Sequence, residues 1–250
     1  MEYQYTCERI WKGYQIYASC ASVIRKGFEL VGAANITNDS LDINSTFIRR
    51  GDSVLEHQAK TAWLASVFLS NFPDFFGKGI TCETSPEVWA YITTALCHDA
   101  GESKIGDIPD DGSLLHDTKD AVELETFQEF IYAYSFFDRR ELLKTFKSFQ
   151  RKDSHPARAL FALDKAEAVL THLMLEKCGI YGSIEAKNNP TERDLRYAEI
   201  AGSNLAADIW GAQMITKFEG FPQEITQPIF ELLNVAAQDV RGEKFLWLNN

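Results

Sequence analysis

The sequence predicts an all-α fold, and three observations lead to this prediction. Apolar residues recur at steps of three and four along several segments, which places them on one face of a helix. No segment shows the alternation of apolar and polar residues that is typical of a half-buried strand. A hydrophobic content of 45% in a chain of 250 residues is ample for one large core. We therefore expect a single helical domain over residues 1–250.

Two helices are expected before residue 75. The first covers residues 8–31, and Gly32 with the polar stretch behind it breaks its apolar pattern. The second covers residues 54–70, where Asp52 or Ser53 can act as the N-cap. A loop rich in proline and glycine follows it.

The third expected helix contains the apolar run Val88 to Leu96. Ser85-Pro86-Glu87 reads as its start, with an N-cap, a proline at the first helical position and an acid in the first turn. Gly101 can end it, which places His98 and Asp99 in the last turn.

Five more helices are expected in the rest of the chain, at residues 114–134, 139–151, 156–178, 191–216 and 222–238. The helix over 156–178 has the strongest apolar stripe, with Ser154 or Asp153 as its cap and Gly179 at its end. Asp164 interrupts this stripe directly after an apolar segment.

Composition and charge exclude several classes of function. A net charge of −11 argues against non-specific binding of nucleic acid, which needs clustered Lys and Arg. The five cysteines are scattered without a CxxC, so neither a disulfide framework nor a zinc knuckle is expected. No stretch approaches about 18 uncharged apolar residues, and the N-terminus lacks the regions of a signal peptide. We expect a cytoplasmic protein that does not bind a membrane.

A cluster of ionisable residues follows the apolar run: His98, Asp99, Glu102, Lys104 and Asp107. Burying so many charges without partners would cost several kcal/mol for each charge. The usual reason for such residues to lie beside a core is a functional site. The remaining histidines have no comparable context, and we expect His116, His155 and His172 at the surface.

His57, His98, Asp99 and Asp164 fall on three separate expected helices. Two imidazoles and two carboxylates suit a borderline divalent ion and leave positions for water and a substrate oxygen. Such an ion lowers the pKa of bound water and polarises a phosphoryl oxygen. Each residue alone has a commoner explanation, since a single histidine is usually satisfied by its surroundings and a single aspartate can bind a nearby backbone group, Lys or Arg. Their joint occurrence favours a metal site.

Three blocks of the chain resemble the HD-domain metal-dependent phosphohydrolases: Ser53-Val54-Leu55-Glu56-His57, then Leu96-Cys97-His98-Asp99-Ala100-Gly101-Glu102 with Gly106-Asp107-Ile108, then Leu163-Asp164-Lys165-Ala166-Glu167. The order His, His-Asp, Asp fits that superfamily. The finer pattern resembles its 5′-deoxynucleotidase branch, with Asp52 in place of a Glu. That branch has an arginine-tryptophan pair ahead of the first histidine, whereas Arg49 and Arg50 stand here in a different spacing.

The resemblance implies a core at about residues 48–178, flanked by extra helices at 1–40 and 190–240. It implies one divalent ion (Mn, Co, Fe, Ni, Zn or Mg), with the ligands His57, His98, Asp99 and Asp164. It also implies an acid-base pair of Glu102 and Asp107. The flanking helices are expected to pack on the core or to form a homodimer interface.

We expect hydrolysis of a small phosphate monoester, most simply a nucleoside 5′-monophosphate. Because the chain is acidic overall, the phosphate must be attracted locally, by the ion and by Arg50, with Lys104 and Arg49 as further candidates. Two alternatives stay open. One is another HD-domain reaction, on a cyclic nucleotide or a nucleoside triphosphate, and the other is a non-catalytic regulatory helical module that binds metal.

Overall fold

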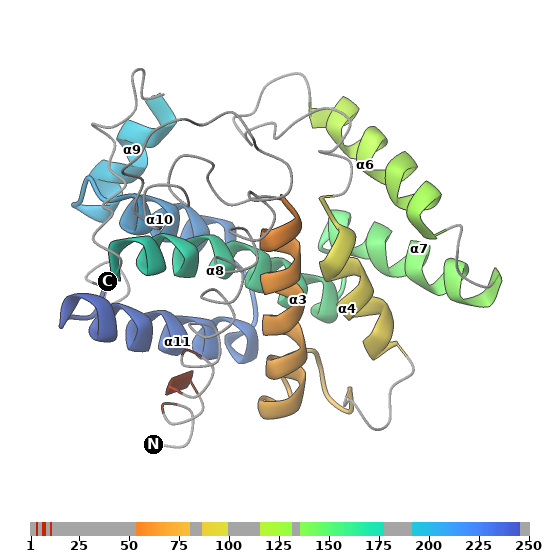
Figure 1. Ribbon diagram of the computed structural model, residues 1–250, viewed down its shortest axis with the longest axis horizontal. Helices are drawn as coiled ribbons and strands as arrows, with labels where there is room; N and C mark the ends of the chain where they lie inside the picture. The colour runs from red at the N-terminus through yellow and green to blue at the C-terminus, as the bar shows by residue number, and fades with distance from the viewer. Residues whose placement is uncertain are drawn as a thin grey trace, which may run out of the picture.

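The computed structural model describes residues 54–80, 87–99, 116–131, 136–177 and 192–245, together with residues 4, 7, 8 and 11. Within these ranges the chain forms helices and no β-strand, which confirms the expected all-α class (Figure 1).

The described residues form eight helices: α3 (Val54–Asn71), α4 (Val88–Cys97), α6 (His116–Ile131), α7 (Phe136–Arg151), α8 (His155–Lys177), α9 (Glu192–Ala201), α10 (Ala206–Lys217) and α11 (Gln223–Arg241). The helix expected at 8–31 falls almost entirely outside the described residues, as does the expected Ser85-Pro86 cap. The helix expected at 54–70 is confirmed, and those at 114–134, 139–151, 156–178 and 222–238 are confirmed to within a few residues.

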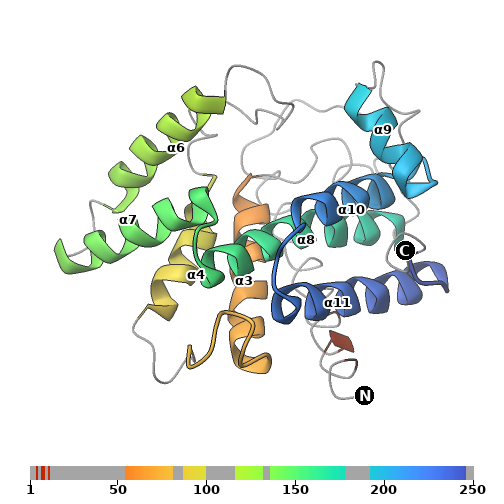
Figure 2. The same ribbon diagram turned by 180° about the vertical axis from the view of Figure 1, so that it is seen from behind.

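Helix α8 lies at the centre of the described helices. It contacts α3, α4, α7, α10 and α11. In Figures 1 and 2, α3 and α4 cross one end of α8 steeply, while α10 and α11 run alongside the other end. Side chains of α3, of α4 and of α8 itself can therefore meet at the place where α3 and α4 cross α8.

The core is built on the apolar stripe of α8. Leu163, Val169 and Leu170 are fully buried, and so are Leu232 and Leu233 of α11, which packs against it. Burying each such side chain contributes roughly 1.5–3 kcal/mol relative to leaving it in water. This packing holds α8 rigidly, and with it the polar residues that interrupt its stripe.

Ser154 starts α8, as the sequence indicates. The Ala157 amide donates to Ser154 Oγ at 3.3 Å, which satisfies one of the unpaired N–H groups of the first turn.

The single helix expected over 191–216 is wrong, because the chain turns between α9 and α10. Gly202 adopts a left-handed φ of 62°, and its amide donates to Glu199 O while the Ser203 amide donates to Ala198 O. These two bonds form a Schellman motif that closes α9. Glycine serves here because it has no Cβ to oppose that conformation.

A buried cluster of ion pairs joins α8, α10 and α11 near the C-terminal end of α8. Arg241 of α11 donates from Nε and Nη2 to the two carboxylate oxygens of Glu176 on α8, at 2.6 and 2.7 Å. Its Nη1 donates to Asp208 Oδ1 of α10 at 2.9 Å. Both acids are buried, and each accepts from the guanidinium, so each carboxylate has a cationic partner within the protein.

Two histidines expected at the surface are half-buried instead. His155 Nε2 lies 3.1 Å from Phe75 O. The His172 ring stacks on Trp210, with 6.2 Å between ring centroids, where α8 packs on α10. Burial lowers the pKa of His172 to about 4, which leaves this imidazole neutral at physiological pH.

The protein should lose stability in acid partly through His172. In the unfolded chain this histidine takes up a proton at an ordinary pKa of about 6.5, whereas in the folded chain it does so only near pH 4. The free energy of unfolding should therefore fall as the pH drops from about 6.5 towards 4, by on the order of 1–2 kcal/mol for a partly exposed ring. Denaturant titrations at pH 7 and 4.5 measure this loss, and His172→Gln should show a smaller one. Equal losses in the two proteins would contradict the assignment.

Candidate metal centre

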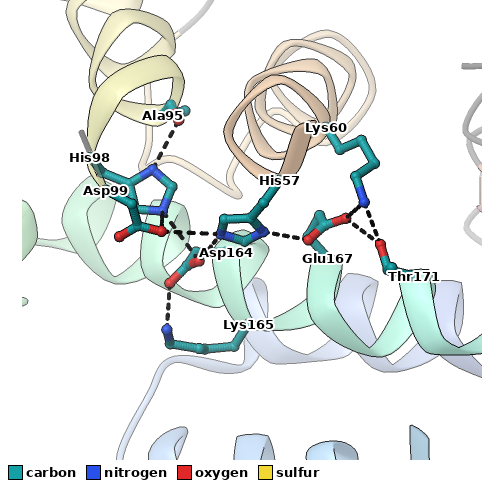
Figure 3. A network of polar contacts seen from close by, with 9 residues as sticks. All are labelled: His57, Lys60, Ala95, His98, Asp99, Asp164, Lys165, Glu167 and Thr171. Carbon is teal, nitrogen blue, oxygen red and sulfur yellow. Dashed lines mark hydrogen bonds and ion pairs between the residues drawn. The ribbon is translucent and has the colours of Figure 1, made fainter. Parts of the chain in front are cut away.

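Helices α3, α4 and α8 bring the four predicted ligands to one place (Figure 3). His57 lies in the first turn of α3, and Asp164 lies in the middle of α8. His98 and Asp99 were expected in the last turn of the third helix, but α4 ends at Cys97, so that His98 is its C-cap and Asp99 follows in a turn. Each of the four offers one ligand atom, and these atoms all lie within 4.8 Å of one another.

The Nε2 atoms of both histidines face the same two carboxylates. Asp164 Oδ1 lies 2.9 Å from His57 Nε2 and 3.3 Å from His98 Nε2. Asp99 Oδ2 lies 3.6 Å from His57 Nε2 and 3.3 Å from His98 Nε2. The ligand atoms therefore surround one point, as the donor set of a single ion does.

The outer nitrogen of each ring is held by an acceptor. His98 Nδ1 donates to Ala95 O at 2.9 Å, and His57 Nδ1 donates to Glu167 Oε2. A carbonyl and a carboxylate oxygen only accept, so Nδ1 carries a proton in both rings. Nε2 is then the nitrogen on the inner side that can offer its lone pair to an ion in place of a proton, which is the usual arrangement around histidine ligands of a metal.

Charge explains why this cluster suits a cation. Burial alone would lower the pKa of His57, but Glu167 and the hydrogen bonds to Asp164 and Glu167 raise it well above its usual range. Burial also acts to lower the pKa of His98, which Asp99 and Asp164 raise. Two neutral Nε2 lone pairs facing carboxylate oxygens would repel them, so a proton or a metal ion has to lie between. The imidazole and carboxylate donors fit a borderline divalent ion.

Asp164 is ionised in this setting. Burial would raise its pKa, but Lys165 and the hydrogen bonds with His57 and His98 hold it well below its usual range. Lys165 Nζ lies 2.7 Å from Asp164 Oδ2, which leaves Oδ1 as the oxygen that faces the two histidines. The carboxylate thus keeps one oxygen for a ligand role and one for a cation of the protein.

The other predicted site residues lie outside the described residues: Arg49, Arg50, Glu102, Lys104 and Asp107. Conversely, Glu167 and Lys60, which contact each other behind His57, were not predicted as site residues. The signal that could have identified these two residues is their spacing from the predicted ligands. Glu167 lies three residues after Asp164 on one helix, and Lys60 lies three after His57 on another, so each pair shares a helix face.

The fold and the cluster define a class: all-α proteins with a His, His-Asp, Asp set suited to one divalent ion. Residues 44–190 match the family model described as HD domain, which is more than half of the chain. The chain therefore belongs to the HD-domain family. Members of this family are usually metal-dependent phosphohydrolases, and the cluster is in keeping with that general activity. No curated protein and no solved structure matches the chain. Among the described residues, no helix is long and apolar enough to cross a membrane.

Removing Asp164 should abolish metal binding. Asp164→Ala deletes the carboxylate that both histidines face, so the metal content of the purified protein should fall to background. Asp208→Ala is a matched control, because it also removes a buried, ion-paired aspartate but lies in the Arg241 cluster. The control should lose stability and keep its metal, as elemental analysis and thermal unfolding would show. Retention of metal by Asp164→Ala would exclude this residue as a ligand.

Proposed function

We propose that the protein is a metal-dependent phosphohydrolase that removes the phosphate from a nucleoside 5′-monophosphate. The single observation that carries the proposal is the convergence of His57, His98, Asp99 and Asp164 on one point, all within the residues 44–190 that match the HD-domain model. The finer substrate class is supported by the resemblance of the three sequence blocks to the 5′-deoxynucleotidase branch.

The four residues would hold the ion, and their environment prepares them for it. The ion, when bound, supplies Lewis acidity towards a phosphoryl oxygen and a lowered pKa for water. Ala95 O and Glu167 fix the two rings with Nε2 inward, and Lys165 holds Asp164 with Oδ1 inward. Little reorganisation is then needed when the ion binds.

We assign the proton transfers to Glu102 and Asp107. Both follow the end of α4, shortly after His98 and Asp99, on the chain that leaves the metal cluster. Glu102 would orient or deprotonate the attacking water, and Asp107 would assist the leaving oxygen. A carboxylate in either role needs a pKa tuned by its site.

The phosphate needs a cation that is not already committed. Lys60 pairs with Glu167 and Lys165 pairs with Asp164, so both lysines in Figure 3 already neutralise a carboxylate. Arg50 is our first choice for the phosphate, with Lys104 and Arg49 as further candidates, because it precedes the block that carries His57. A guanidinium can donate to two phosphate oxygens at once.

Glu102→Gln should separate metal binding from turnover. The variant removes a proton acceptor and no ligand, so we expect unchanged metal content and a turnover lower by on the order of 10²–10⁴-fold. Glu125→Gln, an exposed position of α6, is the matched control and should retain full activity. Steady-state phosphate release with a nucleoside 5′-monophosphate measures both. Full activity of Glu102→Gln would remove Glu102 from the mechanism.

Arg50→Ala should weaken substrate binding without affecting the metal. Loss of a bidentate phosphate contact should raise KM for a nucleoside monophosphate by on the order of tenfold or more, with metal content unchanged. Arg140→Ala, at an exposed position of α7, is the control. A wild-type protein that cleaves only cyclic nucleotides or triphosphates would overturn the substrate class, and one that binds metal but cleaves no phosphate ester would overturn the enzymatic function.

A further inference from the structure

Glu167 lies directly behind the metal cluster, on the side of His57 that faces away from the other ligands (Figure 3). Its side chain is 1% exposed. One carboxylate oxygen, Oε2, accepts from His57 Nδ1. The other, Oε1, lies 2.6 Å from Lys60 Nζ and accepts from Thr171 Oγ1 at 2.5 Å.

Lys60 and Thr171 both contact that second oxygen, and they also contact each other. Lys60 Nζ also donates to Thr171 Oγ1 at 2.5 Å, and both residues are buried. The lysine and the glutamate come from different helices, α3 and α8, so the set joins them beside the ligands His57 and Asp164.

A buried ion pair is not a natural means of stabilising a core. Removing two charges from water is unfavourable, and apolar residues of similar volume are often as stabilising or more so. The pair is therefore better explained by what its geometry does for His57 than by what it adds to packing.

The contacts decide which ring nitrogen of His57 carries its proton. Because Lys60 and Thr171 donate to Oε1, the carboxylate stays ionised and presents Oε2 as a pure acceptor. An acceptor at this place requires Nδ1–H, so Nε2, which faces Asp164 and Asp99, is the nitrogen that can give up its proton and bind an ion.

We propose that Glu167, held by Lys60 and Thr171, is a positioning residue that fixes the ring and tautomer of His57 and thereby sets the affinity of the centre for a divalent metal. This role rests on the metal centre of the proposed function, and it is independent of the substrate.

Glu167→Gln tests the role with minimal change in volume. The amide replaces one oxygen by an NH₂ donor. If the donor faces Lys60, two donors oppose each other. If it faces His57, Nδ1 must accept, and the ring proton moves to Nε2, where it blocks a ligand position. Either orientation disfavours the arrangement that binds metal.

The experiment titrates Co²⁺ into metal-free protein, prepared with a chelator, and follows binding by calorimetry well below Tm. For Glu167→Gln we expect an affinity lower by roughly 10–100-fold, as for other outer partners of histidine ligands. Glu176→Gln is the matched control, because Glu176 is also buried, ion-paired and on α8 but contacts Arg241. Its affinity should stay within about twofold of wild type, since it shares no partner with the centre.

A second variant separates positioning from stability. In Lys60→Met/Glu167→Met, apolar side chains replace the ion pair and should recover the Tm lost in Glu167→Gln, while His57 Nδ1 still has no carboxylate. We expect the Co²⁺ affinity to stay low. Recovery of affinity together with Tm, or wild-type affinity in Glu167→Gln, would overturn the positioning role alone. A wild-type protein that binds no Co²⁺ would overturn the proposed metal centre and this role with it.

Discussion

The described structure depends on one constraint, which is the ionised carboxylate of Asp164 buried in the central helix α8. Its neighbours Leu163 and Ala166 are fully buried, so too little bulk water reaches the carboxylate to solvate it. It has to find its partners within the protein, and it finds them in His57, His98 and Lys165. The meeting of α3 and α4 on α8 is the arrangement that supplies these partners.

The buried carboxylates of the two polar clusters on α8 are neutralised in different ways. In the Arg241 cluster, three guanidinium nitrogens meet three carboxylate oxygens, so the protein supplies its own cation. In the His57–His98 cluster, both rings donate their Nδ1 protons to outer acceptors, and the inner side holds two Nε2 atoms that face two carboxylates. Lys165 neutralises only the outer oxygen of Asp164, so the positive charge between the inner nitrogens and oxygens comes from protons on the rings or from a bound cation. This difference distinguishes a cluster that braces the fold from one suited to an ion.

Much of this could be predicted from sequence, because helical periodicity and residue order are local properties. The spacing of apolar residues gave α3 and α8 nearly to the residue, and the three blocks pointed to the four clustered residues. The contact between Lys60 and Glu167 depends on how α3 crosses α8, and a single sequence does not encode that angle in any readable pattern. The break at Gly202-Ser203 was readable, since a glycine behind an apolar run commonly ends a helix, but the stripe continuing into α10 concealed it.

The central claim is that one divalent ion binds at the point on which the four ligand atoms converge. The most direct measurement is a crystal structure of the protein grown with Co²⁺, with anomalous scattering recorded at the cobalt edge. We predict one strong anomalous peak at roughly 2.0–2.3 Å from the Nε2 atoms of His57 and His98 and from oxygens of Asp99 and Asp164. A peak on other residues, ligation through Nδ1 of either histidine, or no peak within the cluster would contradict the account.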